Sequence, residues 1–221
     1  MPQKFMTPRN GHGNRGNGGK RPPGRPRSEQ ARLSIQRSTL ELLAQKGFSE
    51  FTIEAVAAHA SVGKATVYRW WPDKAALIAD AFAGSATRLL HFPDTGSLRT
   101  DMSQQMQQLV KVFRSRRGRI VSALLGAGQS DPSLIAAFRE RFLKPRRQEA
   151  YATLRRGIQR GELPANTDLD LLLDCLYGPI YMRFLIRHNT LTPEFVEGIC
   201  ENILGPARST RKPPHSQAVS S

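Results

Sequence analysis

The sequence predicts an all-α protein in which an N-terminal three-helix domain containing a helix-turn-helix precedes a larger helical bundle. Apolar residues recur at three- and four-residue spacing between about residues 28 and 204, Ser, Thr or Asp precedes several of these stretches, and no stretch alternates as a half-buried strand does. We expect four segments, namely an arm (1–23), the helix-turn-helix domain (24–82), the bundle (83–205) and a tail (206–221).

The arm is basic and rich in Gly, Asn and Pro. Residues 1–27 hold seven Lys or Arg and residues 206–221 hold three, with no acid in either, so the ends carry ten of the fifteen net positive charges. Without apolar periodicity, residues 1–23 and the tail are predicted to be disordered. Near the end of the arm, prolines keep the chain extended while Arg25 and Arg27 project, which suits a DNA minor groove; a tail that only binds phosphates explains the pattern equally well.

A first helix is predicted over 28–46, and residues 52–74 then read as two short helices around a tight turn. Thr52 can cap the first of these two, and an apolar stripe begins at Ile53. Residues 61–63 make the turn. In the next helix, over 64–71, Val67 and Trp71 share the face that packs inward.

The outward face of helix 64–71 carries donors and an aromatic ring suited to DNA. Arg and Lys bind guanine edges or phosphates, Thr and Tyr bind phosphates, and a methyl group can touch thymine. Pro72 ends this helix, and Asp73 caps the next, which places Lys74 beside N–H groups that favour an anion. The predicted DNA contacts are Lys64, Ala65, Thr66, Tyr68, Arg69, Trp70 and Lys74, although Trp70 is as well suited to packing against the next helix.

Several motifs at fixed spacing, at residues 24–27, 47–48, 52–53, 67–69 and 71–74, make residues 24–82 similar to the N-terminal domain of the TetR family of bacterial repressors. The resemblance implies that Thr66, Tyr68, Arg69 and Lys74 contact DNA and that Thr52 lies near a phosphate. One departure is Ser61, where the family usually has Gly. If the backbone there is left-handed, Ser61 costs about 1 kcal/mol of local strain.

In the bundle, Asp131 and Pro132 start the longest helix, which Gly161 and Pro164 end. Residues 178–181 and 187–195 look like one C-terminal subgroup of the TetR family. The predicted helices are 75–90, 98–114, 118–126, 132–160, 168–188 and 193–204, with a loop over 91–96.

A single helix-turn-helix contacts too little DNA for tight operator binding. We therefore expect two copies of the chain to act as a homodimer. Apolar stripes on the last two helices are the predicted interface, although they could instead close the core of one chain. The stripe residues are Leu172, Leu176, Phe184, Phe195, Ile199 and Ile203.

The family resemblance also implies a cavity for a small-molecule inducer within the bundle. Aromatic residues and methionines at helical spacing fit either such a cavity or an ordinary core. The candidate lining residues are Met102, Met106, Leu109, Phe113, Leu124, Phe138, Phe142, Tyr151 and Leu154.

These features predict a cytoplasmic repressor that a small-molecule effector releases from a palindromic double-stranded operator. The alternative is a protein that coats A·T-rich DNA through its arm without an effector. Scattered histidines, with no nucleophile elbow or phosphate loop, argue against an enzyme, a metal site or a cofactor. No apolar run is long enough to cross a membrane. Cys175 and Cys200 are expected to be buried thiols, with a redox switch between them as the alternative.

Overall fold

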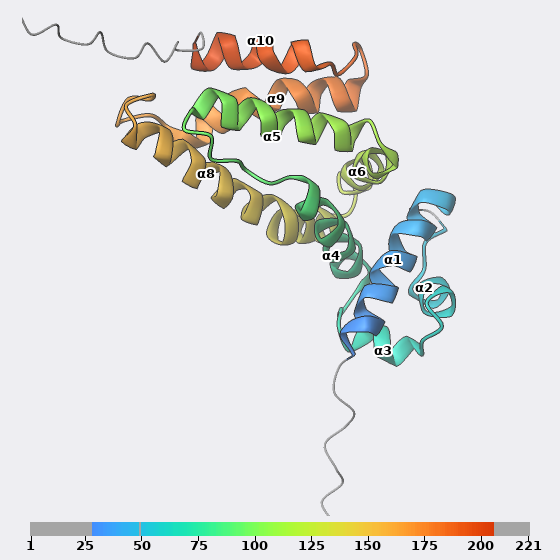
Figure 1. The fold of residues 1–221 in the computed structure, drawn as a ribbon. Helices are drawn as coiled ribbons and strands as arrows, with labels where there is room; N and C mark the ends of the chain where they lie inside the picture. The colour runs from blue at the N-terminus through green and yellow to red at the C-terminus, as the bar shows by residue number, and fades with distance from the viewer. Residues whose placement is uncertain (1–27, 49, 206–221) are drawn as a thin grey trace, which may run out of the picture.

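The computed structural model describes residues 28–48 and 50–205, and every regular element in these ranges is helical (Figure 1). This confirms the predicted fold class. The arm, with Arg25 and Arg27, and the tail lie outside the described residues, so the disorder and minor-groove contacts expected there remain predictions.

The N-terminal domain consists of α1 (Glu29–Lys46), α2 (Ile53–His59), α3 (Lys64–Tyr68) and the first part of α4 (Lys74–Ala86). The hydroxyl of Thr52 accepts a hydrogen bond from the N–H of Ala55 at 3.1 Å, and the carboxylate of Asp73 accepts one from Ala76 at 2.7 Å. These caps satisfy N–H groups that have no partner within the helix. The helices therefore begin where the cap residues predicted.

The turn between α2 and α3 has the left-handed backbone that the sequence predicted. Ser61 has φ 54°, and the next N–H, that of Val62, donates to the carbonyl of Ala57 at 2.9 Å to close the end of α2. A side chain with a Cβ is strained in this region of φ. The strain lies in the loop that sets the angle between α2 and α3.

Replacing Ser61 by glycine is expected to raise the free energy of unfolding by about 0.5–1 kcal/mol, because glycine adopts positive φ without steric cost. The midpoint of urea unfolding measures the effect. Ser85→Gly, inside α4 at ordinary helical dihedrals, is the control and should instead lower stability by about 1 kcal/mol. A destabilised Ser61→Gly variant would contradict the strain argument.

The bundle begins with a short 3₁₀ turn η1 (Thr87–Leu89) and continues through α5 to α10. α5 packs against α10, α6 and α8, while α4 packs against α1 on one side and α7 on the other. In Figure 1, α4 accordingly lies between the N-terminal helices and the rest of the bundle. The remaining elements are α5 (Leu98–Phe113), α6 (Arg116–Ala127), α7 (Pro132–Phe138), η2 (Arg139–Leu143), α8 (Lys144–Gln159), α9 (Leu169–Ile186) and α10 (Pro193–Leu204).

The helix predicted as one piece over 132–160 is interrupted by the π-helical turn η2. Here the N–H of Lys144 donates to the carbonyl of Arg139, five residues back. Pro145 follows directly, and it has no N–H to donate to the carbonyl four residues before it. The wider turn before this proline relieves the resulting mismatch, and such turns often occur at functional sites. The prediction of an unbroken α-helix overlooked Pro145.

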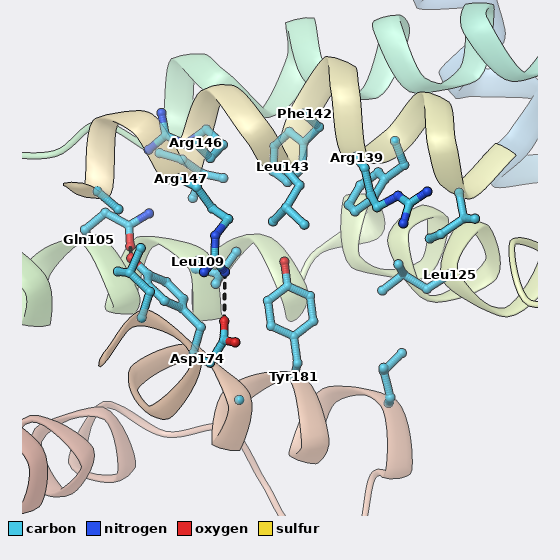
Figure 2. A pocket seen from close by; sticks show the side chains of 18 of the residues that line it. Gln105, Leu109, Leu125, Arg139, Phe142, Leu143, Arg146, Arg147, Asp174 and Tyr181 are labelled. Carbon is cyan, nitrogen blue, oxygen red and sulfur yellow. Dashed lines mark hydrogen bonds and ion pairs between the residues drawn. The ribbon is translucent and has the colours of Figure 1, made fainter. Parts of the chain in front are cut away.

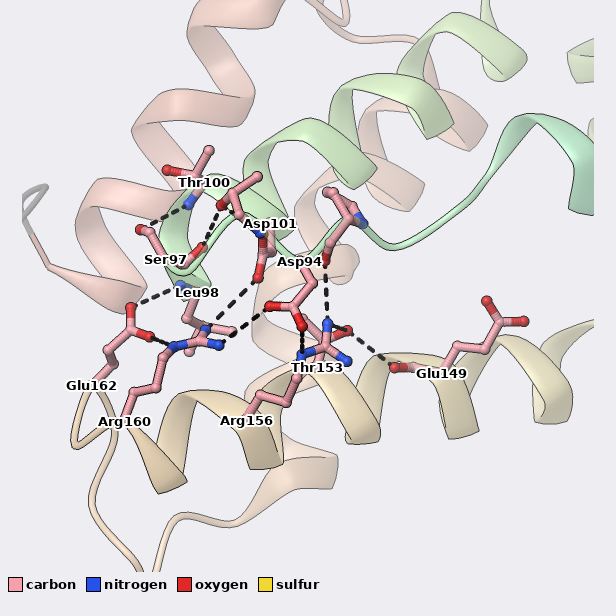
Figure 3. Close-up of polar contacts among 12 residues, drawn as sticks. Asp94, Ser97, Leu98, Thr100, Asp101, Glu149, Thr153, Arg156, Arg160 and Glu162 are labelled. Carbon is pink, nitrogen blue, oxygen red and sulfur yellow. Dashed lines mark hydrogen bonds and ion pairs between the residues drawn. The ribbon is translucent and has the colours of Figure 1, made fainter.

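A polar network ties the loop before α5 to the end of α8, at the end of the bundle away from α3 (Figure 3). Asp101 is fully buried, and one of its oxygens accepts hydrogen bonds from the backbone and hydroxyl of Thr95, both at 2.7 Å. Its other oxygen lies 3.7 Å from the guanidinium of Arg160, which also pairs with Glu162 at 2.5 Å. A buried carboxylate needs such partners, so the network fixes this end of the bundle.

Candidate DNA-binding face and effector cavity

The outer face of α3 lies at the end of the molecule farthest from α9 and α10 (Figure 1). The side chains of Tyr68 and Arg69 are exposed there, as are Lys64 and Ala65, whereas Thr66 is half-buried. Val67, on the opposite side, is fully buried. The structure thus presents the predicted residues of α3 on one accessible face.

Lys64 pairs with an acid of the preceding helix. Its ammonium contacts the carboxylate of Glu54 and lies 5.7 Å from the centre of the Tyr68 ring. This hydrogen bond lowers the pKa of Glu54 and raises that of Lys64. A DNA phosphate that approaches Lys64 has to compete with Glu54.

Thr52 and Lys74 flank this face at the beginnings of α2 and α4. Both are exposed, but each also has a structural contact: Thr52 caps α2, and the ammonium of Lys74 donates to the carbonyl of Phe48 at 3.2 Å. Lys74 also lies over the ring of Phe51, 5.4 Å from its centre. Lys74 therefore joins the start of α4 to the segment after α1.

Trp70 packs into the domain rather than standing free on the outer face. It is half-buried, and the guanidinium of Arg32 lies 5.7 Å from the centre of its ring. Its ring centre is 6.2 Å from that of the neighbouring Trp71, which is 1% exposed. These contacts are with α1 and Trp71 rather than with the next helix, and the DNA contact of Trp70 remains a prediction.

Asp80 on α4 holds the N-terminal helices together, a role that the sequence analysis missed. One carboxylate oxygen accepts hydrogen bonds from the indole N–H of Trp71 and the amide of Gln36, both at 2.9 Å, and lies 3.4 Å from Arg32. A single acid among the mostly apolar residues of α4 was the available signal. Asp80 thereby holds the segment after α3, through Trp71, against α1 and α4.

Replacing Asp80 by alanine is expected to lower the free energy of unfolding by about 2–3 kcal/mol, because the buried indole N–H of Trp71 loses its acceptor. Urea unfolding followed by circular dichroism measures the change. Asp80→Asn keeps an acceptor oxygen and should lose less, and exposed Glu50→Ala serves as the control. Equal stability of Asp80→Ala and Glu50→Ala would contradict the anchoring role.

A second site is a cavity of about 450 Å³ between α5, α6, α7, η2, α8 and α9 (Figure 2). This volume lies within the range of about 300–1,000 Å³ usual for small-molecule pockets. Most of its wall is apolar or aromatic. The lining residues are Leu90, Phe92, Gln105, Leu109, Leu125, Gln129, Ile135, Phe138, Arg139, Phe142, Leu143, Arg146, Arg147, Ala150, Leu173, Asp174, Tyr177, Gly178, Tyr181 and Leu185.

Among the candidate lining residues, Leu109, Phe138 and Phe142 contribute to this wall. The others do not, because their helix faces turn toward neighbouring helices: Phe113, for example, stacks on Phe184 with ring centres 3.9 Å apart. Tyr151 lines a neighbouring hollow, and its hydroxyl donates to Asp170. The buried residues absent from the lining are Met102, Met106, Phe113, Leu124 and Leu154.

Ion pairs between α8 and α9 border the cavity. The guanidinium of Arg147 binds Asp174 at 2.8 Å, drawn dashed in Figure 2, and Asp170 at 2.5 Å. Burial lowers the pKa of Arg147, but the hydrogen bonds to Asp174, Asp170 and Tyr151 outweigh it and raise the pKa above its ordinary value. The cluster connects the two helices beside the cavity.

The residues predicted to form the dimer interface are mostly covered within the single chain. Leu176, Phe184 and Ile199 are buried within the chain, and the other three predicted residues, Leu172, Phe195 and Ile203, are half-buried. The guanidinium of Arg183 covers Phe195, 3.3 Å from its ring centre. The two apolar stripes therefore largely close the core of one chain.

Another stripe on α9 remains exposed. Leu171, Met182 and Ile186 are 61%, 61% and 66% exposed. Cys175 between them is also exposed, so the prediction of a buried thiol is wrong for this residue. Their spacing places them on one face of the helix. Sequence periodicity alone could not distinguish this face from the buried one, because α9 is apolar nearly all round.

Within residues 28–48 and 50–205, none of the helices combines the length and the apolar character needed to span a membrane. In the same residues, no three or more His, Cys, Asp or Glu side chains are grouped so that they could hold a metal ion.

Comparison with known proteins matches residues 35–81 to a family described as bacterial regulatory proteins, tetR family, and residues 92–203 to the tetracyclin repressor-like C-terminal domain. The uncharacterized HTH-type transcriptional regulator YdeS of Bacillus subtilis (strain 168) is 40% identical over 187 residues, 85% of this chain and 94% of that protein. The DNA-binding transcriptional repressor TetR of Mycobacteroides abscessus is 32% identical over 179 residues, which cover 80% of this chain and 94% of that protein.

The solved structure of the TetR family transcription regulator SCO0332 superposes with a TM-score of 0.71 at 35% identity, covering 80% of this chain and 98% of that one. Both halves of the molecule thus match the same family, and they do so in the order in which the structure places a helix-turn-helix and a helical bundle. The chain belongs to the TetR family of helix-turn-helix transcription regulators.

Proposed function

We propose that this DNA-binding regulator is a dimeric repressor that a small-molecule effector releases from a palindromic operator. The observation that carries the proposal is the contact between the wall of the cavity and α4, the helix that begins beside the DNA-binding face. The ring of Phe82 on α4 lies 4.8 Å from that of Phe142 and 6.1 Å from that of Phe138, centre to centre. Both phenylalanines line the cavity.

An effector in the cavity can act on DNA binding through this aromatic contact. If it binds better when η2 and α4 are displaced, it favours a dimer whose recognition helices no longer match successive major grooves, about 34–36 Å apart. A differential affinity of about 1–3 kcal/mol lowers operator affinity about 5- to 150-fold. The cavity need not touch DNA to have this effect.

Dimerisation through the exposed stripe of α9 would supply the second recognition helix. Four large or sulfur-bearing apolar side chains in a row, Leu171, Cys175, Met182 and Ile186, are unusual on a free surface. A two-fold axis beside α9 would bring two copies of the stripe together and bury them. This replaces the interface predicted from sequence, in which Leu176 and Ile199 took part.

Two related proteins support the finer parts of the proposal. The Mycobacteroides abscessus protein is called a repressor. FadR of Bacillus subtilis, which shares this fold at 18% identity, was solved in complex with stearoyl-CoA. We infer repression and an effector for the present chain by analogy with these two proteins.

A footprint on the DNA flanking the protein's own gene, with excess random-sequence competitor, tests the proposal. We expect protection of an inverted repeat, with affinity about 1,000-fold above that for random DNA. A protein that coats A·T-rich DNA through its basic arm would instead give uniform binding that competitor removes. That result, repeated on a genome-wide pool of fragments, would refute operator binding.

A further inference from the structure

The polar groups around the cavity are mostly donors, and this imbalance indicates the chemical class of its ligand. Three guanidinium groups line the cavity, those of Arg139, Arg146 and Arg147, against the single carboxylate of Asp174. Asp174 already accepts from Arg147 at 2.8 Å. Asp170 also pairs with Arg147, and Glu149 pairs with Arg146, so the charges of these two guanidinium groups are offset. The positive charge of Arg139 remains, which disfavours a cationic ligand and favours an anion.

The guanidinium groups differ in how far they are neutralised. Arg146 binds Glu149 at 2.6 Å and lies over the ring of Phe92, but its Nη2 is buried and has no hydrogen-bond partner. Arg139 is exposed at the edge of the cavity, and no acid among the described residues pairs with it. Arg139 is thus the positive charge most available to a ligand.

Two neutral groups add further donors. Tyr181 projects its hydroxyl from α9 toward the wall formed by η2 and α8 (Figure 2). Its ring packs edge-on against Phe113, but within the described chain the hydroxyl makes no hydrogen bond, and burial raises its pKa to about 12. The Oε1 atom of Gln105 accepts a hydrogen bond from the hydroxyl of Tyr177. The amide N–H groups of Gln105 have no acceptor within the described part of the chain.

We propose that the effector is an apolar organic acid, whose aromatic or aliphatic body fills the cavity and whose carboxylate accepts hydrogen bonds from Arg139 and Tyr181. This inference rests on the proposed function, because it assigns the ligand of the same cavity. The body packs on Phe138 and Phe142, so the acid also contacts the two rings that touch α4. Charge-assisted hydrogen bonds select a carboxylate over an uncharged acceptor.

Isothermal titration calorimetry on the full chain without DNA tests the class, with three probes that share a biphenyl body: biphenyl-4-carboxylate, the uncharged 4-acetylbiphenyl and the cationic 4-phenylbenzylammonium. We expect the carboxylate to bind at least about tenfold more tightly than the ketone and the ammonium to bind most weakly. Arg139→Gln should remove this tenfold preference and leave the affinity for the ketone unchanged. Tyr181→Phe should weaken the carboxylate and the ketone alike, about fivefold.

Arg141→Gln is the matched control, because Arg141 is exposed on the same turn of η2 but does not line the cavity. It should bind all three probes as the unaltered chain does. A ketone that binds as tightly as the carboxylate, or a carboxylate that does not bind, would overturn the inference. Because no DNA is present, either result would leave the operator footprint as an independent test of the repressor function.

Discussion

Replacing Tyr68 and Arg69 together by alanine is expected to weaken specific operator binding at least about 1,000-fold. Both side chains are exposed, Tyr68 on the last residue of α3 and Arg69 directly after it, and the family resemblance assigns both to DNA. A contact of this kind contributes about 1–3 kcal/mol, and a dimer makes each contact twice. Fluorescence anisotropy with a labelled operator at fixed salt concentration measures the loss.

The double variant should keep the stability of the unaltered protein, because neither side chain packs in the core. Lys111→Ala combined with Arg117→Ala is the control, since it removes two exposed cations from the bundle and should leave specific binding nearly unchanged. If the Tyr68/Arg69 variant still distinguished operator from random DNA as well as the control does, α3 would not be the recognition helix.

The sequence predicts the helix-turn-helix well because local rules determine most of it. Caps at Thr52 and Asp73 set the starts of α2 and α4, and the inward positions of Val67 and Trp71 follow from helical spacing. The left-handed backbone at Ser61 was likewise anticipated and is found. Each of these features depends on residues close together in the chain. The end of α3 was predicted less well, because the helix ends at Tyr68, three residues before the predicted end at Trp71.

Features that depend on distant contacts were predicted less well. Asp80 on α4 binds Gln36 and Arg32 of α1 and Trp71 after α3. Its place as the one acid of α4 marks it as unusual but does not show which residues it binds. The cavity is equally non-local, since helical spacing shows that Met106 and Phe142 are apolar but not that only Phe142 faces an open space. Periodicity identifies an inward face, and the packing of several helices decides what that face meets.

The sequence also cannot tell which apolar face of α9 packs in the core and which forms the proposed dimer interface. One pair of substitutions distinguishes the two faces. Replacing Met182 and Ile186 by glutamate is expected to convert the protein to monomers and to weaken operator binding at least about 100-fold. The two side chains are about two-thirds exposed in the single chain, so the charges cost little there but would be buried in the proposed dimer. Sedimentation velocity measures the change in mass.

A charge introduced elsewhere on the surface should leave the dimer intact. Leu89→Glu is the matched control, because Leu89 is a large exposed apolar residue on η1, away from α9, and this variant should sediment as the unaltered protein does. Thermal unfolding separates loss of the interface from loss of the fold, because monomers that keep their helical signal show that only the contact between copies was removed. An unaltered dimer in the Met182/Ile186 variant would exclude this stripe and return the interface to α10, where Phe195 and Ile203 are half-buried.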